Sequence, residues 1–261
     1  MNTLREKIKS NKKLCGTLVC LTDPCLCEIM GNIGYDCVWI DMEHTYVSSK
    51  DVLCHLNAAN SSGISSVVRL PQNDLTETKK ILEMAPDGVI FPMVRSVDEV
   101  KALLDMTLYP PLGTRGFGPM RAIRYGADDA KEYVTDRNLE LCRFIQIEHI
   151  DCVNALEELV TIPYIDGYIF GPNDLSGSIN DFLNVFDTAT ITLIERAIKI
   201  LRDNGKFIGL AGGMDDKTIE FWSKFDLDIM FAGGDWNFVF DAGKETLKRL
   251  EKYHKNIMSC S

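Results

Sequence analysis

Acidic and imidazole side chains follow apolar runs at three places in this chain of 261 residues. The most informative is Ile40-Asp41-Met42-Glu43-His44, where two carboxylates and an imidazole end an apolar run. A run that begins at residue 143 ends at Glu148, and one that begins at residue 167 is followed by Asp174. Short apolar runs predict buried strands, and these polar side chains do acid–base chemistry or bind metal ions. Three strands that finish in acids therefore predict one shared polar site.

Glu148 and Asp174 are predicted to follow neighbouring strands. Their oxygens are hard ligands of the kind that Mg²⁺ and Mn²⁺ prefer, and these ions keep part of their water shell. The two carboxylates together predict a divalent metal site completed by water and substrate. The alternative is that each acid caps a following helix or pairs with an arginine.

His44 is predicted to be a general base oriented by Asp41. A carboxylate bonded to one ring nitrogen fixes the imidazole tautomer and leaves the other nitrogen free to take a proton. Of the four histidines in the chain, this one alone ends a predicted strand beside two acids. The alternative is a loop histidine whose ring nitrogens both have structural partners.

Arg69 ends another apolar run, so its guanidinium is predicted to lie at the same site. There it can hold a carboxylate or a developing enolate oxygen, and its five donors also let it pair with a nearby acid. No predicted strand ends in a lysine. This disfavours carbon–carbon cleavage through an imine and leaves electron withdrawal to a metal ion or to fixed hydrogen-bond donors.

Eight apolar runs recur along the chain, and most do not alternate with polar residues. They cover residues 14–21, 35–41, 65–70, 88–94, 142–147, 167–170, 206–210 and 227–231. Continuous runs of this kind suit parallel strands covered on both faces. Helix-like segments lie between them, at residues 48–53, 76–84, 97–104 and 190–203 among others. The pattern predicts a single α/β domain over residues 1–261, a (β/α)8 TIM barrel whose site lies at the carboxyl ends of the strands.

An open, doubly wound sheet is the alternative fold, but Leu21-Thr22-Asp23-Pro24 stands where such a sheet usually has a glycine-rich turn. Residues 109–119 are rich in Gly and Pro and predict an ordered loop. This loop lacks the lysine and hydroxyl residue of a phosphate-binding P-loop. Residues 238–255 predict a long amphipathic helix whose apolar face needs a partner surface.

Composition excludes several classes of function. A net charge of −10 with dispersed acids argues against nucleic acid as a partner. The first residues lack the apolar segment of a signal peptide or membrane span, so no membrane association and a cytoplasmic location are expected. The nine cysteines, odd in number, are expected to be reduced thiols.

Several segments in this order resemble the HpcH/HpaI aldolases of the phosphoenolpyruvate/pyruvate barrel superfamily. The resemblance spans nearly the whole chain and rests on Ile40-Asp41-Met42-Glu43-His44, Val68-Arg69-Leu70-Pro71, Phe91-Pro92-Met93-Val94, Tyr109-Pro110-Pro111, Arg115-Gly116-Phe117-Gly118, Gln146-Ile147-Glu148 and Gly171-Pro172-Asn173-Asp174-Leu175-Ser176. It implies a metal-dependent (class II) aldolase that reversibly cleaves a 4-hydroxy-2-oxo acid, such as 2-dehydro-3-deoxyglucarate or 2,4-dihydroxyhept-2-enedioate, to pyruvate and an aldehyde.

The resemblance also assigns roles to residues of this chain. Glu148 and Asp174 would hold Mg²⁺ or Mn²⁺, with Co²⁺ or Zn²⁺ as further options, and Arg69 would stabilise the enolate. His44, oriented by Asp41, would be the base. The remaining expected substrate contacts are Gln146, Gly171, Pro172, Asn173, Leu210 and Phe117.

Family members are typically homo-oligomers, trimers or hexamers, that exchange their last helix, and the loop that carries Phe117 reaches a neighbour's pocket. Asn173, Met42 and Gly212-Gly213-Met214 depart from the family's usual residues and bear on the aldehyde side. Two other enzyme functions use the same enolate: oxaloacetate decarboxylation and citrate-lyase-β-like cleavage. A non-catalytic barrel that binds oxo acids is the remaining alternative.

Overall fold

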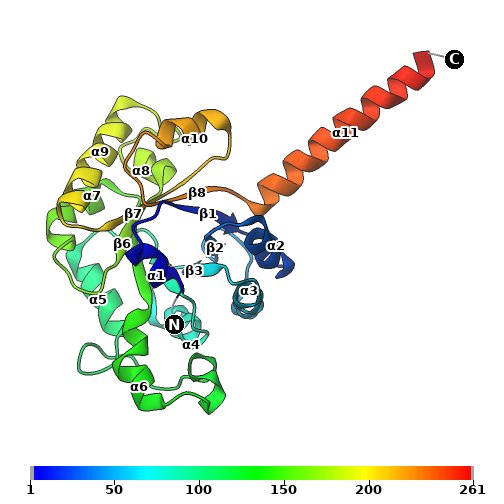
Figure 1. Cartoon of the computed structure of the whole chain (residues 1–261). Helices are drawn as coiled ribbons and strands as arrows, with labels where there is room; N and C mark the ends of the chain where they lie inside the picture. The colour runs from blue at the N-terminus through cyan, green and yellow to red at the C-terminus, as the bar shows by residue number, and fades with distance from the viewer. Residues whose placement is uncertain (1–2, 260–261) are drawn as a thin grey trace.

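The computed structural model describes residues 3–259 and contains a closed barrel of eight parallel strands in sequence order (Figure 1). The strands are β1 (Leu14–Val19), β2 (Cys37–Asp41), β3 (Ser65–Arg69), β4 (Gly88–Phe91), β5 (Cys142–Ile147), β6 (Gly167–Phe170), β7 (Phe207–Gly212) and β8 (Ile229–Gly234). Helices connect successive strands, which confirms the predicted (β/α)8 architecture.

Most of the helices begin at a residue whose side chain accepts a hydrogen bond from a backbone amide of the first turn. They are α1 (Thr3–Lys9), α2 (Cys25–Ile33), α3 (Ser49–Ser62), α4 (Leu75–Glu83), α5 (Val97–Thr107), α6 (Ala130–Thr135), α7 (Ile150–Leu159), α8 (Pro172–Ser178), α9 (Thr188–Asp203), α10 (Asp216–Trp222) and α11 (Asp235–Ser259). Ser48 and Asp51 form a reciprocal capping box at α3, and the Asp74 carboxylate accepts two amides at α4. The short 3₁₀ helices η1 (Arg121–Gly126) and η2 (Arg137–Glu140) flank α6.

Alternate residues of each strand point into the barrel, and this alternation sets which side chains reach its carboxyl end. In β2, Cys37 and Trp39 belong to the apolar cluster inside the barrel, whereas Val38 and Ile40 pack under the helices. Asp41 is the next inward position. The strand therefore fills the core and then presents a carboxylate at the carboxyl end of the barrel, which we call the mouth.

Two strands end at least two residues earlier than their apolar runs predict, and each has a local backbone reason. After Val19, the amides of Cys20 and Leu21 donate to the Asp235 carboxylate, at 3.0–3.1 Å. After Phe91 comes Pro92, which has no N–H, and then Met93 in a left-handed conformation with φ of 52°.

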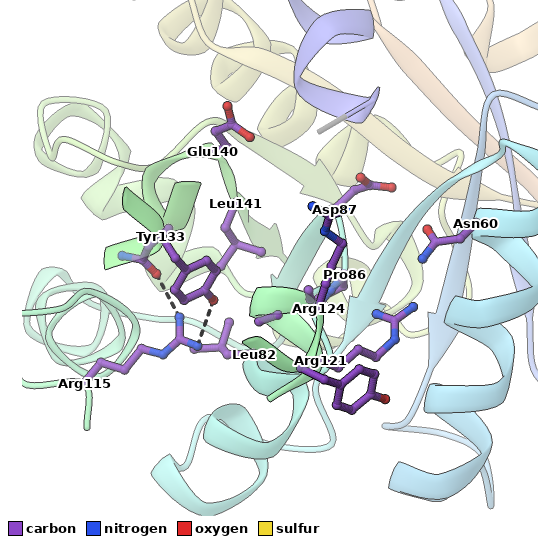
Figure 2. Close-up of a pocket in the computed structure, with 14 residues that line it drawn as sticks. Asn60, Leu82, Pro86, Asp87, Arg115, Arg121, Arg124, Tyr133, Glu140 and Leu141 are labelled. Carbon is purple, nitrogen blue, oxygen red and sulfur yellow. Dashed lines mark hydrogen bonds between the residues drawn. The ribbon is translucent and has the colours of Figure 1, made fainter. Parts of the chain in front are cut away.

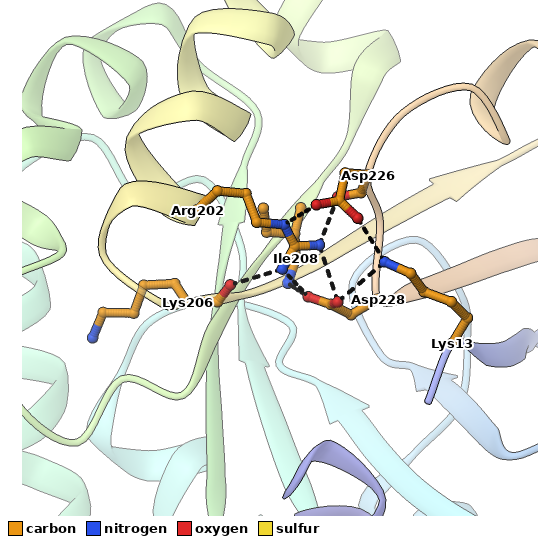
Figure 3. Close-up of polar contacts among 6 residues, drawn as sticks. All are labelled: Lys13, Arg202, Lys206, Ile208, Asp226 and Asp228. Carbon is orange, nitrogen blue, oxygen red and sulfur yellow. Dashed lines mark hydrogen bonds and ion pairs between the residues drawn. The ribbon is translucent and has the colours of Figure 1, made fainter. Parts of the chain in front are cut away.

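Four aspartates at the amino end of the barrel make the same kind of hydrogen bond between neighbouring strands. Each immediately precedes an even-numbered strand and accepts a backbone N–H from the odd-numbered strand before it. The pairs are Asp36 with Cys15, Asp87 with Ser66, Asp166 with Arg143 and Asp228 with Ile208, at 2.8–2.9 Å. Figure 3 shows the last of them, where Asp228 also pairs with Arg202 at 2.7 Å and Lys13 at 3.5 Å.

The last helix, α11, projects away from the barrel (Figure 1). It runs beyond the predicted bounds of residues 238–255 in both directions. Its large apolar side chains are more than half exposed along one stripe, namely Trp236, Val239, Phe240, Leu247, Leu250 and Tyr253. An amphipathic helix whose apolar face meets water lacks the packing that normally stabilises it.

No helix within residues 3–259 is both long and apolar enough to cross a membrane. The eight cysteines in this part of the chain form no disulfide with one another, and Cys260 lies outside the described residues. Burial raises the pKa of the Cys27 thiol to about 12 and that of Cys152 to about 12, as expected for cysteines that serve as packing residues.

Candidate active site

The first element of the site is an ion pair between Asp41 and Arg69. The two residues lie opposite each other in the β2–β3 register, both at inward positions. Arg69 Nε donates to Asp41 Oδ1 at 2.8 Å and Nη2 to Oδ2 at 2.6 Å. Burial works to lower the pKa of Arg69, but the hydrogen bond and charge of Asp41, together with the charges of Glu43 and Glu148, outweigh it and the pKa is raised. The guanidinium is therefore a fixed cation at the mouth.

Glu43 and Glu148 complete the surroundings of Arg69. Arg69 Nη1 lies 2.9 Å from Glu43 Oε2 and 3.8 Å from Glu148 Oε1. Burial raises the pKa of Glu43, and the charges of Asp41 and Asp174 add to the rise, while Arg69 and His44 oppose it. The mouth thus gathers more carboxylates than its arginine can neutralise.

The prediction that Asp41 orients His44 is wrong. Both Asp41 oxygens are taken by Arg69, and Oδ1 also accepts the Glu43 amide at 3.0 Å. The carboxylate near His44 is that of Glu43, with Oε2 at 3.6 Å from Nε2, and the imidazole is 61% exposed. Strand register places Asp41 inside the barrel, whereas His44 lies in the loop beyond the strand.

Glu148 is as deeply buried as Asp41, with 2% exposure. Its Oε2 accepts the Met93 amide at 2.9 Å. Burial raises the pKa of Glu148 to about 8, and the charges of Glu43 and Asp174 add to the rise, while the Met93 amide and Arg69 oppose it. A carboxylate in such a setting favours a bound proton or a bound cation.

The start of α8 approaches Glu148 from β6. A Cβ on Gly171 would lie 2.8 Å from Glu148 Oε1 and 3.0 Å from Gln146 Nε2, so this backbone position excludes larger residues. Gln146 is buried on the inward face of β5, and its Oε1 has no hydrogen-bond partner among the described residues. Asp174 lies in the first turn of α8 and Pro172 is buried, whereas Asn173 is exposed at the mouth.

The structure thus brings nine of the predicted residues to one mouth: Asp41, Arg69, Gln146, Glu148, Gly171, Pro172, Asn173, Asp174 and, at its exposed edge, His44. Within the described part of the chain, no group of three or more His, Cys, Asp or Glu side chains is arranged to hold a metal ion. The assignment of Glu148 and Asp174 as metal ligands stays a prediction. His149, beside Glu148, caps α7 through its Nδ1.

Leu210 does not reach the mouth, which corrects its predicted role as a substrate contact. It is fully buried and belongs to the apolar layer between strands and helices. The neighbouring Ala211 packs with the interior cluster instead. The prediction missed the inward face of β7 by one residue, and in a strand one residue exchanges the two faces.

The loop around Phe117 lies at the amino end of its own barrel, because Arg115 bonds Asn138 and Tyr133, which precede β5. Phe117 is 61% exposed there. A cavity of about 430 Å³ lies beside this loop (Figure 2). Its arginines already have partners: Arg121 bonds Asn57 and Arg124 pairs with Asp128. This cavity stands apart from the predicted site.

Sequence reasoning missed the Met93 amide as a partner of Glu148. Its direction depends on the left-handed backbone of a non-glycine residue, for which Phe91-Pro92-Met93-Val94 gives no signal. Glu43 as the partner of both Arg69 and His44 was also missed. Its place between Asp41 and His44 was the available signal.

We expect the metal-free protein to lose stability as the pH rises from 6 to 8. The pKa of Glu148 is higher in the folded state, at about 8, than its ordinary 4.5, so the folded state holds the proton more tightly and loses that advantage as pH approaches 8. The loss should be about 2 kcal/mol by linkage. Urea unfolding at both pH values in chelator measures it. Glu148→Gln should remove most of the difference, and an unchanged difference in that variant would contradict the assignment.

Comparisons with known proteins agree with this geometry. The family model described as HpcH/HpaI aldolase/citrate lyase matches residues 15–209. A hydroxypyruvate/pyruvate aldolase of Roseovarius nubinhibens is 27% identical over 95% of this chain and 96% of its own. A protein of the same name from Deinococcus radiodurans is 30% identical over 93% and 87%. The crystal structure of an HpcH/HpaI aldolase from Desulfitobacterium hafniense DCB-2 shares the fold, with a TM-score of 0.89, 23% identity and coverage of 96% and 97%.

Proposed function

Because the chain belongs to the HpcH/HpaI aldolase/citrate lyase family and is therefore a carbon–carbon lyase of the aldolase type, we propose that it reversibly cleaves a 4-hydroxy-2-oxo acid to pyruvate and an aldehyde. The observation that carries the proposal is the mouth around Arg69, where one fixed guanidinium faces the half-buried Glu43 and the buried Glu148. An oxo acid needs such a cation for its carboxylate or enolate, and surplus carboxylates suit a second, inorganic cation.

The residues at the mouth fit a divalent ion. Glu148 and Asp174 offer hard oxygen ligands, and Gly171 leaves room against Glu148 Oε1 that a side chain would fill. The ion would be Mg²⁺, Mn²⁺ or a similar metal, and when bound it would draw electrons from the keto oxygen of the substrate. The unpartnered Oε1 of Gln146 supports a polar ligand at the same place.

Cleavage requires that the 4-hydroxyl lose its proton while the bond between C3 and C4 breaks. His44 would take this proton, since its exposed ring borders the mouth beside Glu43. The hydroxyl carbon becomes the aldehyde, and the electron pair of the broken bond passes to the pyruvate enolate. Arg69, held in place by Asp41, would stabilise the enolate oxygen. Protonation of C3 then gives pyruvate.

The remaining contacts fall on the two halves of the substrate. Gln146 and the backbone at Gly171 and Pro172 would contact the pyruvate half. Asn173, exposed at the mouth, would border the aldehyde half, together with Phe117 of the partner subunit. A reducing compartment such as the cytoplasm suits the free thiols of the described residues.

Pyruvate release from a panel of 4-hydroxy-2-oxo acids tests the proposed activity. Cleavage should require added Mn²⁺ or Mg²⁺, fall to background with chelator and return when metal is restored, because the electron-withdrawing group is then removed and replaced. Coupled lactate dehydrogenase measures the pyruvate, and mass spectrometry identifies the aldehyde. Cleavage that persists in chelator would refute the metal role.

The exposed stripe of α11 is proposed to pack on a second copy of the chain. It presents Trp236, Phe240 and Leu250 on one face, and burial of such a stripe between subunits would stabilise the helix. We expect sedimentation to find an oligomer, and Phe240→Glu to shift it toward smaller species. Lys248→Gln, an exposed position on the same helix that changes the net charge by the same amount, is the control for charge. A monomeric wild-type protein would contradict the proposal.

A further inference from the structure

The Pro92–Met93 peptide group links the loop residue Asn73 to the buried Glu148. The carbonyl and the amide of the Pro92–Met93 peptide bond both have side-chain partners. Asn73 Nδ2 donates to the Pro92 carbonyl oxygen at 2.6 Å. The Met93 N–H of the same peptide donates to Glu148 Oε2 at 2.9 Å. Because the C=O and N–H of a trans peptide point in opposite directions, the three groups form one chain of hydrogen bonds.

The backbone at this peptide adopts a conformation that needs such support. Met93 has a φ of 52°, in the left-handed region, which costs a non-glycine residue roughly 1–2 kcal/mol. The opposite orientation of the peptide would turn the Pro92 carbonyl oxygen, rather than the Met93 amide, toward the Glu148 carboxylate. Two oxygens would then repel each other. The Asn73 donor holds the carbonyl on the far side and so keeps the amide facing Glu148.

The fixed peptide also leaves one particular oxygen of Glu148 available. Oε2 is held by Met93, while Oε1 faces Gly171 and lies 3.8 Å from Arg69 Nη1, beyond hydrogen-bond distance. Polarisation along the chain strengthens the bond to Oε2. Oε1 is therefore the oxygen presented toward the mouth.

We propose that Asn73 is a positioning residue that, through the Pro92–Met93 peptide, holds Glu148 in the orientation in which Oε1 binds the divalent ion. This inference rests on the proposed function, since it concerns the same ion. Outer groups that orient a metal ligand typically affect affinity by 10–100-fold when they are removed. Asn73 touches neither substrate nor ion, so its effect should appear first in metal affinity.

The test is the affinity of the metal-free protein for Mn²⁺, measured from free Mn²⁺ by electron paramagnetic resonance without substrate. Asn73→Ala and Asn73→Asp should each weaken binding on the order of 10-fold, because neither can donate to the Pro92 carbonyl. Asn73→Asp keeps the size of the side chain and serves if the alanine variant fails to fold. Asn73→Gln retains a donor and should bind closer to wild type. Gln72→Ala, the neighbouring exposed amide, is the matched control and should bind as wild type does.

Thermal unfolding of the same metal-free variants separates positioning from loss of structure. Weaker Mn²⁺ binding in Asn73→Asp at an unchanged unfolding temperature, with recovery in Asn73→Gln, supports the proposal. Wild-type affinity in both Asn73→Ala and Asn73→Asp would overturn it. A wild-type protein that binds no Mn²⁺ would instead overturn the metal site of the proposed function, so the two failures are distinguishable.

Discussion

Arg69→Ala should lower kcat/KM for aldol cleavage roughly 10²–10³-fold, the loss seen when a fixed donor to a developing oxyanion is removed. The variant should also unfold more easily. Asp41 is 2% exposed and both its oxygens depend on Arg69, and a buried charge left unpaired costs about 3–5 kcal/mol. Steady-state kinetics and urea unfolding measure the two effects on the same preparation.

Arg69→Lys separates catalysis from folding in this experiment. Lysine keeps the charge but cannot form the two parallel bonds to Asp41, so it should recover much of the stability and little of the rate. Arg95→Ala, an exposed arginine that follows β4, is the matched control. If Arg69→Lys cleaved substrate as fast as wild type, the bidentate geometry would have no part in the reaction.

Glu148→Gln should abolish metal-dependent cleavage, with a loss on the order of 10³-fold, yet stabilise the metal-free protein at pH 8. The amide keeps the shape but removes a ligand charge. It also removes a carboxylate whose charged form burial disfavours, which is why the pKa of Glu148 lies near 8. Loss of activity together with a gain in stability is the opposite of what damage to the fold produces. Pyruvate release and thermal unfolding in chelator are the measurements.

Glu157→Gln, on the exposed face of α7, is the control for the loss of one carboxylate. It should change neither activity nor stability measurably, since surface changes of this kind have small effects. A Glu148→Gln protein that still cleaved substrate with added metal would remove Glu148 from the proposed ligands.

The sequence predicts the composition of the site better than its pairings. Uninterrupted apolar runs that end in acids place Asp41, Arg69 and Glu148 at one end of a parallel barrel, where the structure has them. The pairing of Asp41 with Arg69 rather than His44 depends on the β2–β3 register, which spans residues far apart in the chain. A periodic pattern within one strand carries no record of its neighbour's register.

Two further errors also concern the direction in which a single group points. The apolar run that contains Leu210 shows no alternation, so its inward face could not be assigned. The Met93 amide was overlooked because its direction follows from a left-handed φ that tertiary contacts impose. What the sequence could not supply was the orientation of groups already assigned to the right region.

The four aspartates at the amino end of the barrel group its strands into four successive pairs. The two strands of each pair are joined by one carboxylate, and the four carboxylates are those of Asp36, Asp87, Asp166 and Asp228. Because these hydrogen bonds lie at the end away from the chemistry, the loops at the opposite rim can diversify toward new substrates while the paired strands keep their register.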